Sequence, residues 1–380
     1  MEGLYIHIPF CKSICAYCDF PKVVTKKENM YKYIPALKKE IDYYQNDIKN
    51  IKTLYIGGGT PSILPLDLFD DLLSHLAKYV DLSKLIEFSV ETNPQDLSCE
   101  LINLFKKFYV SRISIGVETF DKELGDYLNR INSFELVDEK IKMIREIGDF
   151  DINLDMMYKL PFQTINSLKK DLELIKKLDV EHISYYSLIL EEKTILDYRY
   201  KRNEFDILNE EIELSMQELI DNELKDLGFI KYEISNYAKE SHKGKHNLLY
   251  WNLKEYLGIG AAAHSQFNNK RLFNPSDYLK YIEKIENNEL DNLKEEYEFD
   301  SFSEHFLMGL RKCEGVKLED VPTSFDELIN KYPILDYYLE NGLLVYENGY
   351  LKFTSRGMNL GNLVFEVFVW DNHLKNIFII

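Results

Sequence analysis

Short runs of β-branched and aromatic residues alternate with longer amphipathic segments over the first half of the chain. The runs that predict strands are Leu4–Ile8, Thr53–Ile56, Glu87–Glu91, Arg112–Val117, Ile152–Met157 and His182–Leu188. The segments between them that predict helices are Met30–Tyr44, Leu66–Tyr79, Cys99–Phe108, Glu135–Ile147 and Ile165–Leu178. Strand-then-helix units in this order predict a parallel α/β sheet with its helices on one side. Because functional residues gather at the carboxyl ends of such strands, we expect one site there.

The second half of the chain loses this alternation. Asn209–Leu227 predicts one long acidic helix that ends at Gly228, followed by extended residues at Tyr232–Tyr237 and small residues at Gly258–Ala263. The acidic stretch Glu283–Asp300 predicts a surface segment or linker. Further helices are predicted at Phe302–Arg311, Phe325–Lys331 and Met358–Val369, with a hairpin at Leu343–Tyr346 and Tyr350–Phe353. We therefore expect three parts, residues 1–228, 229–290 and 291–380, the last a small winged-helix-like α+β domain.

The charge balance narrows the possible partners. The chain has 46 basic and 64 acidic side chains, so its formal charge is 46 − 64 = −18. This excess repels phosphate backbones and argues against nucleic acid as the main partner. No apolar run reaches the roughly 20 residues that span a bilayer, and Met1–Pro9 lacks the features of a signal peptide. We expect a cytoplasmic protein without a transmembrane segment, which leaves room for peripheral membrane contact.

Three of the five cysteines crowd into eight residues. Cys11, Cys15 and Cys18 have the spacing C-x3-C-x2-C, whereas Cys99 and Cys313 stand alone. Three thiolates on one loop can hold three irons of a four-iron cluster and leave the fourth iron open. The alternative is a zinc site completed by a histidine such as His7. The spacing favours iron–sulfur, because structural zinc prefers paired C-x2-C elements and no second pair is present.

The cysteine motif resembles the signature of the radical S-adenosylmethionine (SAM) superfamily, C-x3-C-x-aromatic-C, with Tyr17 as the aromatic residue. The resemblance implies that SAM chelates the open iron of a [4Fe-4S] cluster through its amino and carboxylate groups. One electron from the cluster then cleaves a carbon–sulfur bond to give a 5′-deoxyadenosyl radical. It also implies a partial (β/α)6 barrel, which agrees with the strand count above.

Glycines and charged residues stand where the predicted strands end. Gly57-Gly58-Gly59-Thr60-Pro61 is either an ordinary tight turn or a loop that a ligand approaches closely. Carboxylates at strand ends can bind ribose hydroxyls or an ammonium, although surface ion pairs are the commoner role. By resemblance to the coproporphyrinogen-oxidase-like branch of the superfamily, the residues that contact SAM are Tyr5, Tyr17, Gly58, Gly59, Thr60, Glu91, Glu118, Arg130 and Asp155.

Two features select a subfamily within this branch. Oxygen-independent coproporphyrinogen oxidases have a further cysteine where this chain has Phe20, whereas HemW-type heme chaperones resemble this chain in Cys18-Asp19-Phe20 and in His246-Asn-Leu-Leu-Tyr-Trp251. Imidazole is a good axial ligand for heme iron, and the two aromatic rings offer flat apolar faces. The alternative for His246 is a packed aromatic turn with a hydrogen-bonded histidine. The other histidines are weaker candidates (His7, His264) or expected surface residues (His75, His242, His305, His373).

The resemblance implies a heme chaperone that binds one [4Fe-4S] cluster, SAM and heme and delivers heme to apo-proteins, including respiratory heme proteins. The runner-up is a coproporphyrinogen III dehydrogenase of porphyrin biosynthesis, an activity that we do not expect here, and we assign no catalytic residue. A third hypothesis is a zinc-stabilised binding protein. Three positions depart from the family pattern: Glu118-Thr119 replaces Gln-Ser, and Lys159 replaces the glycine of Gly-Leu-Pro.

Overall fold

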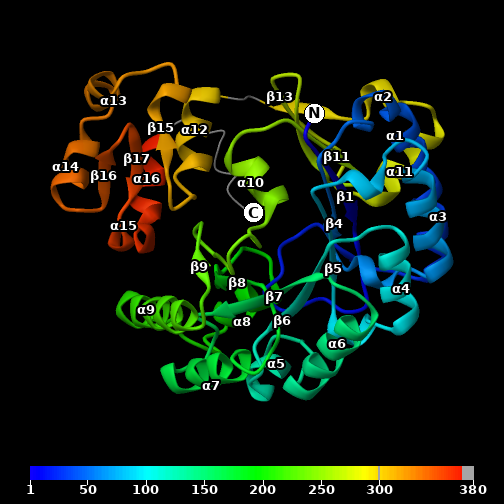
Figure 1. Ribbon diagram of the computed structural model, residues 1–380, viewed down its shortest axis with the longest axis horizontal. Coiled ribbons are helices and arrows are strands. Elements are labelled where there is room, and N and C mark those ends of the chain that lie inside the picture. Colours follow the sequence, from blue (N-terminus) through cyan, green and yellow to red (C-terminus); the bar gives the residue numbers. More distant parts are fainter. Residues whose placement is uncertain (298–299, 370–380) are drawn as a thin grey trace.

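A curved sheet forms the body of the protein in the computed structural model, which describes residues 1–297 and 300–369. Its centre contains the six predicted parallel strands, hydrogen-bonded in chain order. They are β1 (Gly3–Ile8), β4 (Thr53–Gly58), β5 (Glu87–Thr92), β6 (Arg112–Glu118), β7 (Asp151–Tyr158) and β8 (His182–Ser187). Figure 1 shows that these strands form a strongly curved sheet, so the prediction of a partial α/β barrel is confirmed.

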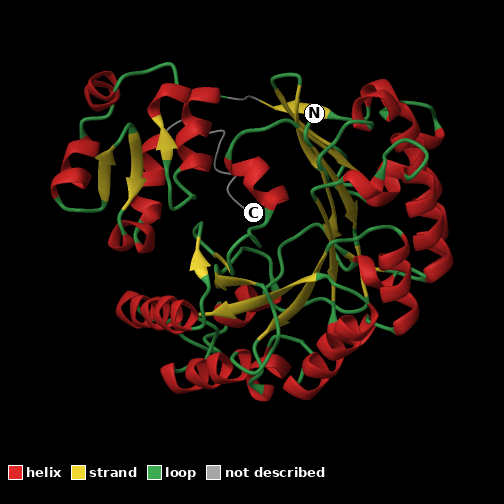
Figure 2. Cartoon of the chain, viewed as in Figure 1, coloured by secondary structure: helices red, strands yellow, loops and turns green. Residues whose placement is uncertain are grey.

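The strands alternate between an apolar outer face and a more polar inner face. Outward residues such as Ile6, Ile56 and Val90 are fully buried in the main core, beneath the helices. Figures 1 and 2 show these helices along the convex side of the sheet. They are α1 (Lys27–Tyr43), α3 (Leu66–Leu76), α4 (Cys99–Lys107), α5 (Lys122–Tyr127), α6 (Phe134–Ile147) and α7 (Ile165–Ile175). The inner face keeps polar and aromatic side chains, which is where a site can form.

The large sheet extends beyond the six predicted strands at both edges. β11 (Tyr256–Ile259) lies parallel to β1, and antiparallel strands follow at β12 (His264–Phe267), β13 (Lys270–Phe273) and β14 (Glu295–Tyr297). At the other edge, β10 (Asn236–Ala238) pairs with β8 and β9 (Ile230–Lys231). The segment 229–290, expected to connect two domains, is therefore part of this sheet by its hydrogen bonding. The short strands β2 (Phe10–Cys11) and β3 (Val23–Val24) pair separately.

The prediction that Glu283–Asp300 is a surface segment is confirmed for most of its described part, where only Ile285 and Leu293 are buried, but the stretch is not a linker. It begins with the end of α11 (Tyr278–Glu286) and ends with β14 at the sheet edge. Between them, Leu293 is fully buried in the main core. Packing on α1 and the sheet outweighs the acidic composition here.

The carboxyl-terminal elements build a second core around a three-stranded sheet. They are α12 (Ser301–Gly309), β15 (Val316–Lys317), α13 (Phe325–Lys331), α14 (Ile334–Glu340), β16 (Leu344–Glu347), β17 (Tyr350–Phe353), α15 (Ser355–Asn359) and α16 (Gly361–Phe368). The predicted hairpin is confirmed, since Asn348 and Gly349 both have positive φ, as a two-residue β-turn requires. The predicted last helix is divided into α15 and α16. No described helix is long and apolar enough to cross a bilayer.

Three further helices, α8, α9 and α10, follow β8 in the chain. α8 (Ile195–Tyr200) packs near the cysteine loop, and α9 (Glu210–Asp226) is the predicted long acidic helix, with Gly228 at φ +83° just beyond it. α10 (Lys245–Trp251) carries the His-Asn-x-x-Tyr-Trp motif. Figure 1 shows α10 on the concave side of the sheet, facing the carboxyl-terminal elements.

Candidate functional site

The loop that carries the three cysteines follows β1 and is fixed to the barrel at its middle. Ala16 is fully buried; its N–H donates to the carbonyl of Leu128, and its carbonyl accepts from Leu196. Near the start of the loop, the hydroxyl of Thr60 donates to Cys11 Sγ at 3.6 Å. The sequence therefore places Cys11, Cys15 and Cys18 at the carboxyl end of the first strand, as predicted.

The three thiols are partly buried beside positive charge. Burial raises the pKa of each of them, to about 11 for Cys15, and the guanidinium of Arg130 acts in the opposite direction on Cys15. No three His, Cys, Asp or Glu side chains in the described ranges are gathered around one metal position. The thiols lie on one short loop without enclosing a site. Their number and softness still fit the three-thiolate set of a [4Fe-4S] cluster.

His7 is held by the protein rather than presented to a metal. Its Nε2 donates to the carbonyl of Pro21 at 3.0 Å, and Nδ1 accepts from the hydroxyl of Tyr5 at 2.9 Å. Burial lowers the pKa of His7 to about 4, so the ring is neutral at pH 7. With both ring nitrogens bonded, His7 is a poor fourth ligand for zinc in this arrangement.

The glycine loop at the end of β4 packs directly against the cysteine loop. Gly58 has φ +113°, and a Cβ there would lie 2.5 Å from the ring of His7; a Cβ on Gly59 would lie 2.7 Å from the carbonyl oxygen of Phe10. The N–H groups of Gly59 and Thr60 donate to backbone carbonyls of the cysteine loop's first residues. Glycine is needed at these positions because the two loops lie too close together for a side chain. An amino group of a ligand is a donor, so it would bind the carbonyl oxygens of this loop.

Glu118 and Arg130 form a buried ion pair at the carboxyl end of β6. Glu118 Oε1 accepts from the guanidinium of Arg130 and from the hydroxyl of Tyr17, the latter at 2.9 Å. Glu118 Oε2 and Arg130 Nε are buried and have no partner among the described residues. Glu118 also has φ +63°, a strained conformation for a residue with a side chain. Unpartnered charged atoms in a strained, buried place fit the binding of a polar ligand such as SAM.

Asn93 is a site residue that sequence reasoning missed. Its Oδ1 accepts from Arg130 Nη1 at 2.7 Å, and its Nδ2 donates to Thr60 Oγ1 at 3.2 Å. With the bond from Thr60 to Cys11, this makes a continuous chain from the guanidinium to a thiol. The signal was available, because Asn93 directly follows β5 in the same motif as Glu91.

Glu91 and Asp155 lie on the inner face of the barrel. Glu91 accepts from the Tyr55 hydroxyl at 2.7 Å and from the Gly58 N–H at 3.0 Å. Asp155 accepts from the hydroxyl of Ser114 at 2.7 Å. Burial raises the pKa of Glu91 to about 7, with the nearby Asp155 adding to the effect, and burial raises the pKa of Asp155 as well. Buried carboxyls whose ionisation is disfavoured can be stabilised as carboxylates by a cationic ligand.

His246 lies at the opposite end of the barrel from the cysteines. It is fully buried; Nδ1 shares a hydrogen bond with Thr53 Oγ1 and Nε2 with the Tyr250 hydroxyl, both at 2.7 Å. Burial lowers its pKa to about 3, so the ring is neutral. Thr53 is the first residue of β4, whereas the cysteine loop meets the last residues of that strand. Binding of heme iron by His246 would require one of these two hydrogen bonds to open.

The segment from Lys239 to Asn252 closes the amino end of the barrel. The N–H groups of Lys245 and His246 donate to the two carboxylate oxygens of Glu87, the first residue of β5. His242 Nδ1 bonds Asp151, the first residue of β7, at 2.6 Å. The cysteines and the nine predicted SAM contacts thus lie inside the barrel or in the loops at its carboxyl end. α10 lies across the opposite, amino end.

Several remaining predictions can be placed directly. His75 is buried and bonded to Asp42, so its expected surface position is wrong. His242 and His305 are half-buried, and His373 lies outside the described residues. His264 stacks on Phe273. Cys99 is exposed and Cys313 partly buried.

Comparisons with known proteins agree with this arrangement. Residues 5–175 match the family described as radical SAM superfamily, and residues 300–360 match the HemN C-terminal domain. The chain is 35% identical to the heme chaperone HemW of Lactococcus lactis subsp. lactis (strain IL1403), over 98% of both chains. It is 34% identical to the heme chaperone HemW of Bacillus subtilis (strain 168), over 98% of this chain and 100% of that one.

A solved structure has the same overall fold. Coproporphyrinogen III oxidase (HemN) from Escherichia coli superposes with a TM-score of 0.83 over 97% of this chain and 90% of that one. The two sequences are 20% identical, so this likeness concerns the fold. It covers both the large sheet and the small carboxyl-terminal part.

Proposed function

Since the chain belongs to the HemW heme chaperone family of the radical SAM superfamily, we propose that it binds a [4Fe-4S] cluster, SAM and heme and delivers the heme to apo-proteins, respiratory heme proteins among them. Cys11, Cys15 and Cys18 would hold three irons of the cluster. The observation that carries the proposal is this three-thiol loop beside an ion pair with unpartnered buried atoms, in a chain similar to heme chaperones throughout its length.

The residues around the thiols would bind and orient SAM. The cluster, when bound, supplies an electron and one open iron position. The guanidinium of Arg130, whose Nε is unpartnered among the described residues, suits a carboxylate, and Glu118 Oε2 suits a hydroxyl or an ammonium. Glu91 and Asp155 would balance the positive sulfonium or amino group from the inner face of the barrel.

We propose that heme binds near α10, at the other end of the barrel. His246 remains a candidate axial ligand, but its two hydrogen bonds favour a different role in which it positions the helix. Trp251 is similarly engaged: its ring is buried and the guanidinium of Arg311 lies 5.0 Å from its centre. This aromatic motif packs α10 between the barrel and the carboxyl-terminal part.

The alternative activity is dehydrogenation of coproporphyrinogen III. It would need a substrate propionate close to the cluster, and the position that carries an additional cysteine in those enzymes is Phe20, 46% exposed beside the cysteine loop. This substitution favours the chaperone. We further propose that the protein works in the reducing cytoplasm, which suits five free thiols.

The test reconstitutes the full chain anaerobically with iron and sulfide, titrates it with heme, and then adds SAM, a reductant and coproporphyrinogen III. We expect tight heme binding, heme transfer to an apo-protein and no protoporphyrinogen. Multiple turnovers to protoporphyrinogen would replace the chaperone by the dehydrogenase. In the His246→Ala variant, a Soret maximum at the wild-type position would support a positioning role, whereas a shifted maximum in a folded variant would make His246 the iron ligand.

A further inference from the structure

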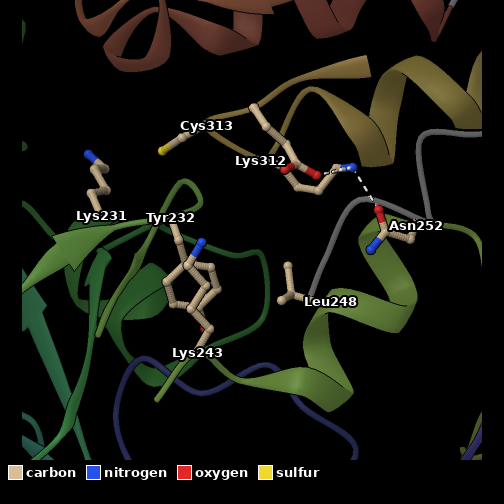
Figure 3. Close-up of a pocket in the computed structure, with 8 residues that line it drawn as sticks. Lys231, Tyr232, Lys243, Leu248, Asn252, Lys312 and Cys313 are labelled. Carbon is tan, nitrogen blue, oxygen red and sulfur yellow. Dashed lines mark hydrogen bonds and ion pairs between the residues drawn. The ribbon is translucent and has the colours of Figure 1, made fainter. Parts of the chain in front are cut away.

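A pocket of about 360 Å³ lies between α10, the β9 region and the start of the carboxyl-terminal sheet. Figure 3 shows Lys231, Lys243 and Lys312 around it, with Leu248 and Asn252 on the facing helix. Three lysines in one pocket are notable in a chain whose formal charge is −18. The remaining lining residues are Tyr232, Cys313 and Glu314.

The lysines retain hydrogen-bond donors for a ligand. Lys231 bonds Asp221 at 3.1 Å, and Lys312, only 8% exposed, bonds Asn252 at 2.6 Å and Glu314 at 3.1 Å. Lys243 has no ion-pair partner among the described residues; its ammonium lies 5.7 Å from the centre of the Tyr232 ring. Because each ammonium has three N–H donors, all three lysines can donate a hydrogen bond to a further anionic partner. With Asp221 and Glu314 counted, the pocket keeps a net positive charge.

α10 has two faces with different roles. His246 and Tyr250 are four residues apart, so they share one face, which is bonded to the base of the barrel. Leu248 and Asn252 are also four residues apart and, at 100° per residue, lie on the opposite face, which lines the pocket. The motif that identifies the family thus fixes the helix with one face and turns the other towards the lysines.

The geometry points to this pocket as the binding site for the carboxylates of the heme, an assignment that rests on the proposed function. The two propionates leave one edge of a flat apolar ring, so their recognition requires cations next to apolar surface. Lys231, Lys243 and Lys312 supply the cations, and Leu248 and Tyr232 supply the apolar surface. Charge-assisted hydrogen bonds from the lysines would fix the orientation of the ring edge.

The test compares heme with its dimethyl ester and with iron-free protoporphyrin IX, using the full chain. Lys243→Gln removes one exposed positive charge, and Lys231→Gln with Lys243→Gln removes two. The matched controls are Lys280→Gln on α11 and the pair Lys169→Gln with Lys280→Gln, which remove the same charge from exposed positions outside the pocket. Circular dichroism and thermal unfolding check that each variant is folded.

We expect about threefold weaker heme binding for Lys243→Gln and about tenfold for the double variant, the size of one and two exposed ionic contacts. The loss should also appear with protoporphyrin IX, which has the carboxylates without iron, and should vanish with the dimethyl ester. Heme affinity that is unchanged, or that falls equally in the control pair, overturns the assignment and leaves the proposed function intact. A wild-type chain that binds no heme at all overturns both.

Discussion

The two ends of the barrel differ in what lies beside their unpartnered polar atoms. At the carboxyl end, Glu118 Oε2 and Arg130 Nε are buried without partners among the described residues, next to three free thiols. At the amino end, both ring nitrogens of His246 and both oxygens of Glu87 are hydrogen-bonded. Nε and Nη1 of Arg112 have no hydrogen-bond partner there among the described residues, but Nε lies 3.5 Å from the Glu87 carboxylate, which balances the charge. Leaving a buried polar atom unpaired costs about 1–3 kcal/mol, so the carboxyl end gives up stability that a bound ligand can restore.

Residues with a side chain and positive φ occur at both ends of the barrel. Glu118 and Lys159 both have φ +63°, at the carboxyl end of β6 and directly after β7. Such conformations persist where surrounding structure enforces them, and they concentrate at functional sites. At the amino end, Ser241 and Leu253 flank α10 with φ +71° and +49°, and hydrogen bonds join α10 to the first residue of β5. We infer that one end is built for binding and the other for holding the chain together.

The largest expected effect is at the cysteine loop. Replacing any one of Cys11, Cys15 and Cys18 by alanine should abolish the broad visible absorbance of the reconstituted cluster, since a site with three protein ligands has no spare thiolate. Visible absorption and iron content after anaerobic reconstitution measure this.

The matched controls for that prediction are the two solitary cysteines. Cys99→Ala and Cys313→Ala should keep the absorbance, because Cys99 is exposed on α4 and Cys313 lines the distant pocket beside α10. Zinc bound stoichiometrically in place of iron would contradict the assignment.

The next largest effect is expected at the amino end, where replacing Glu87 should lower the free energy of unfolding. Glu87→Ala removes the acceptor of the two N–H groups that begin α10 and the partner of Arg112, 3.5 Å away. Loss of one partner from a buried pair should lower the free energy of unfolding by about 3–5 kcal/mol. Urea denaturation measures it, with Glu139→Ala on the exposed side of α6 as the control. A loss below about 1 kcal/mol would mean that α10 does not hold the base of the barrel.

A somewhat smaller effect, on ligand affinity, should appear at the carboxyl end. Arg130→Ala leaves Glu118 without its buried cation and should weaken SAM binding by about 2–5 kcal/mol. Calorimetry of the reconstituted protein gives the affinity. Arg145→Ala is the control, because Arg145 pairs with Glu181 at 2.5 Å near the amino ends of the strands. Equal SAM affinity in wild type and Arg130→Ala would remove Arg130 from the site.

The central strands and their order could be predicted from the sequence because their outward residues are uniformly apolar. Predicted and observed bounds of these strands differ by no more than two residues at either end, as between Thr53–Ile56 and β4. The polar residues on the inner face, such as Ser114 and Asn153, follow the same period of two, so their position could also have been inferred. They were overlooked because each alone resembles an ordinary strand residue.

The sheet edge beyond β1 and the amino end of the barrel could not be predicted in the same way. β11 to β14 are short, and the acidic residues of 283–297 conceal the buried Leu293 and the strand that follows. The motif around His246 looked like a ligand-binding turn, because the sequence cannot reveal that Thr53, 193 residues away, takes up one ring nitrogen. Long-range hydrogen bonds of this kind decide whether a histidine is available, and no local pattern encodes them.

The free energy of unfolding should also depend on pH through Glu91, which lies on the inner face of the barrel. Burial raises the pKa of Glu91 from an ordinary 4.5 to about 7, so between these values the folded state binds more protons than the unfolded chain. The free energy of unfolding should therefore fall as the pH rises through this window, by up to about 1.4 kcal/mol per pH unit for this one group. Glu91→Gln should flatten the curve of unfolding free energy against pH, because an amide does not ionise in this range. The amide can still donate to the Tyr55 hydroxyl and accept from the Gly58 N–H, so the variant should remain folded.

The measurement for Glu91 is urea denaturation of both proteins at several pH values from 4.5 to 8. Glu233, whose pKa burial also raises to about 7, remains in both and cancels in the difference. Parallel curves for wild type and Glu91→Gln would mean that Glu91 ionises in the folded protein as it does in water.

The smallest effect concerns Lys159, which follows β7 with φ +63°. A residue with a Cβ in the left-handed region costs about 1–2 kcal/mol, which Lys159→Gly would recover. The same change loses the ion pair between Lys159 and Glu213, at 2.5 Å, and adds freedom to the unfolded chain. These contributions nearly cancel, so Lys159→Gly should stay within about 0.5 kcal/mol of wild type. Lys159→Ala keeps the strain and loses the ion pair, so it should be about 1 kcal/mol less stable than Lys159→Gly in urea denaturation. Equal stability of the two variants would show that the turn after β7 is unstrained.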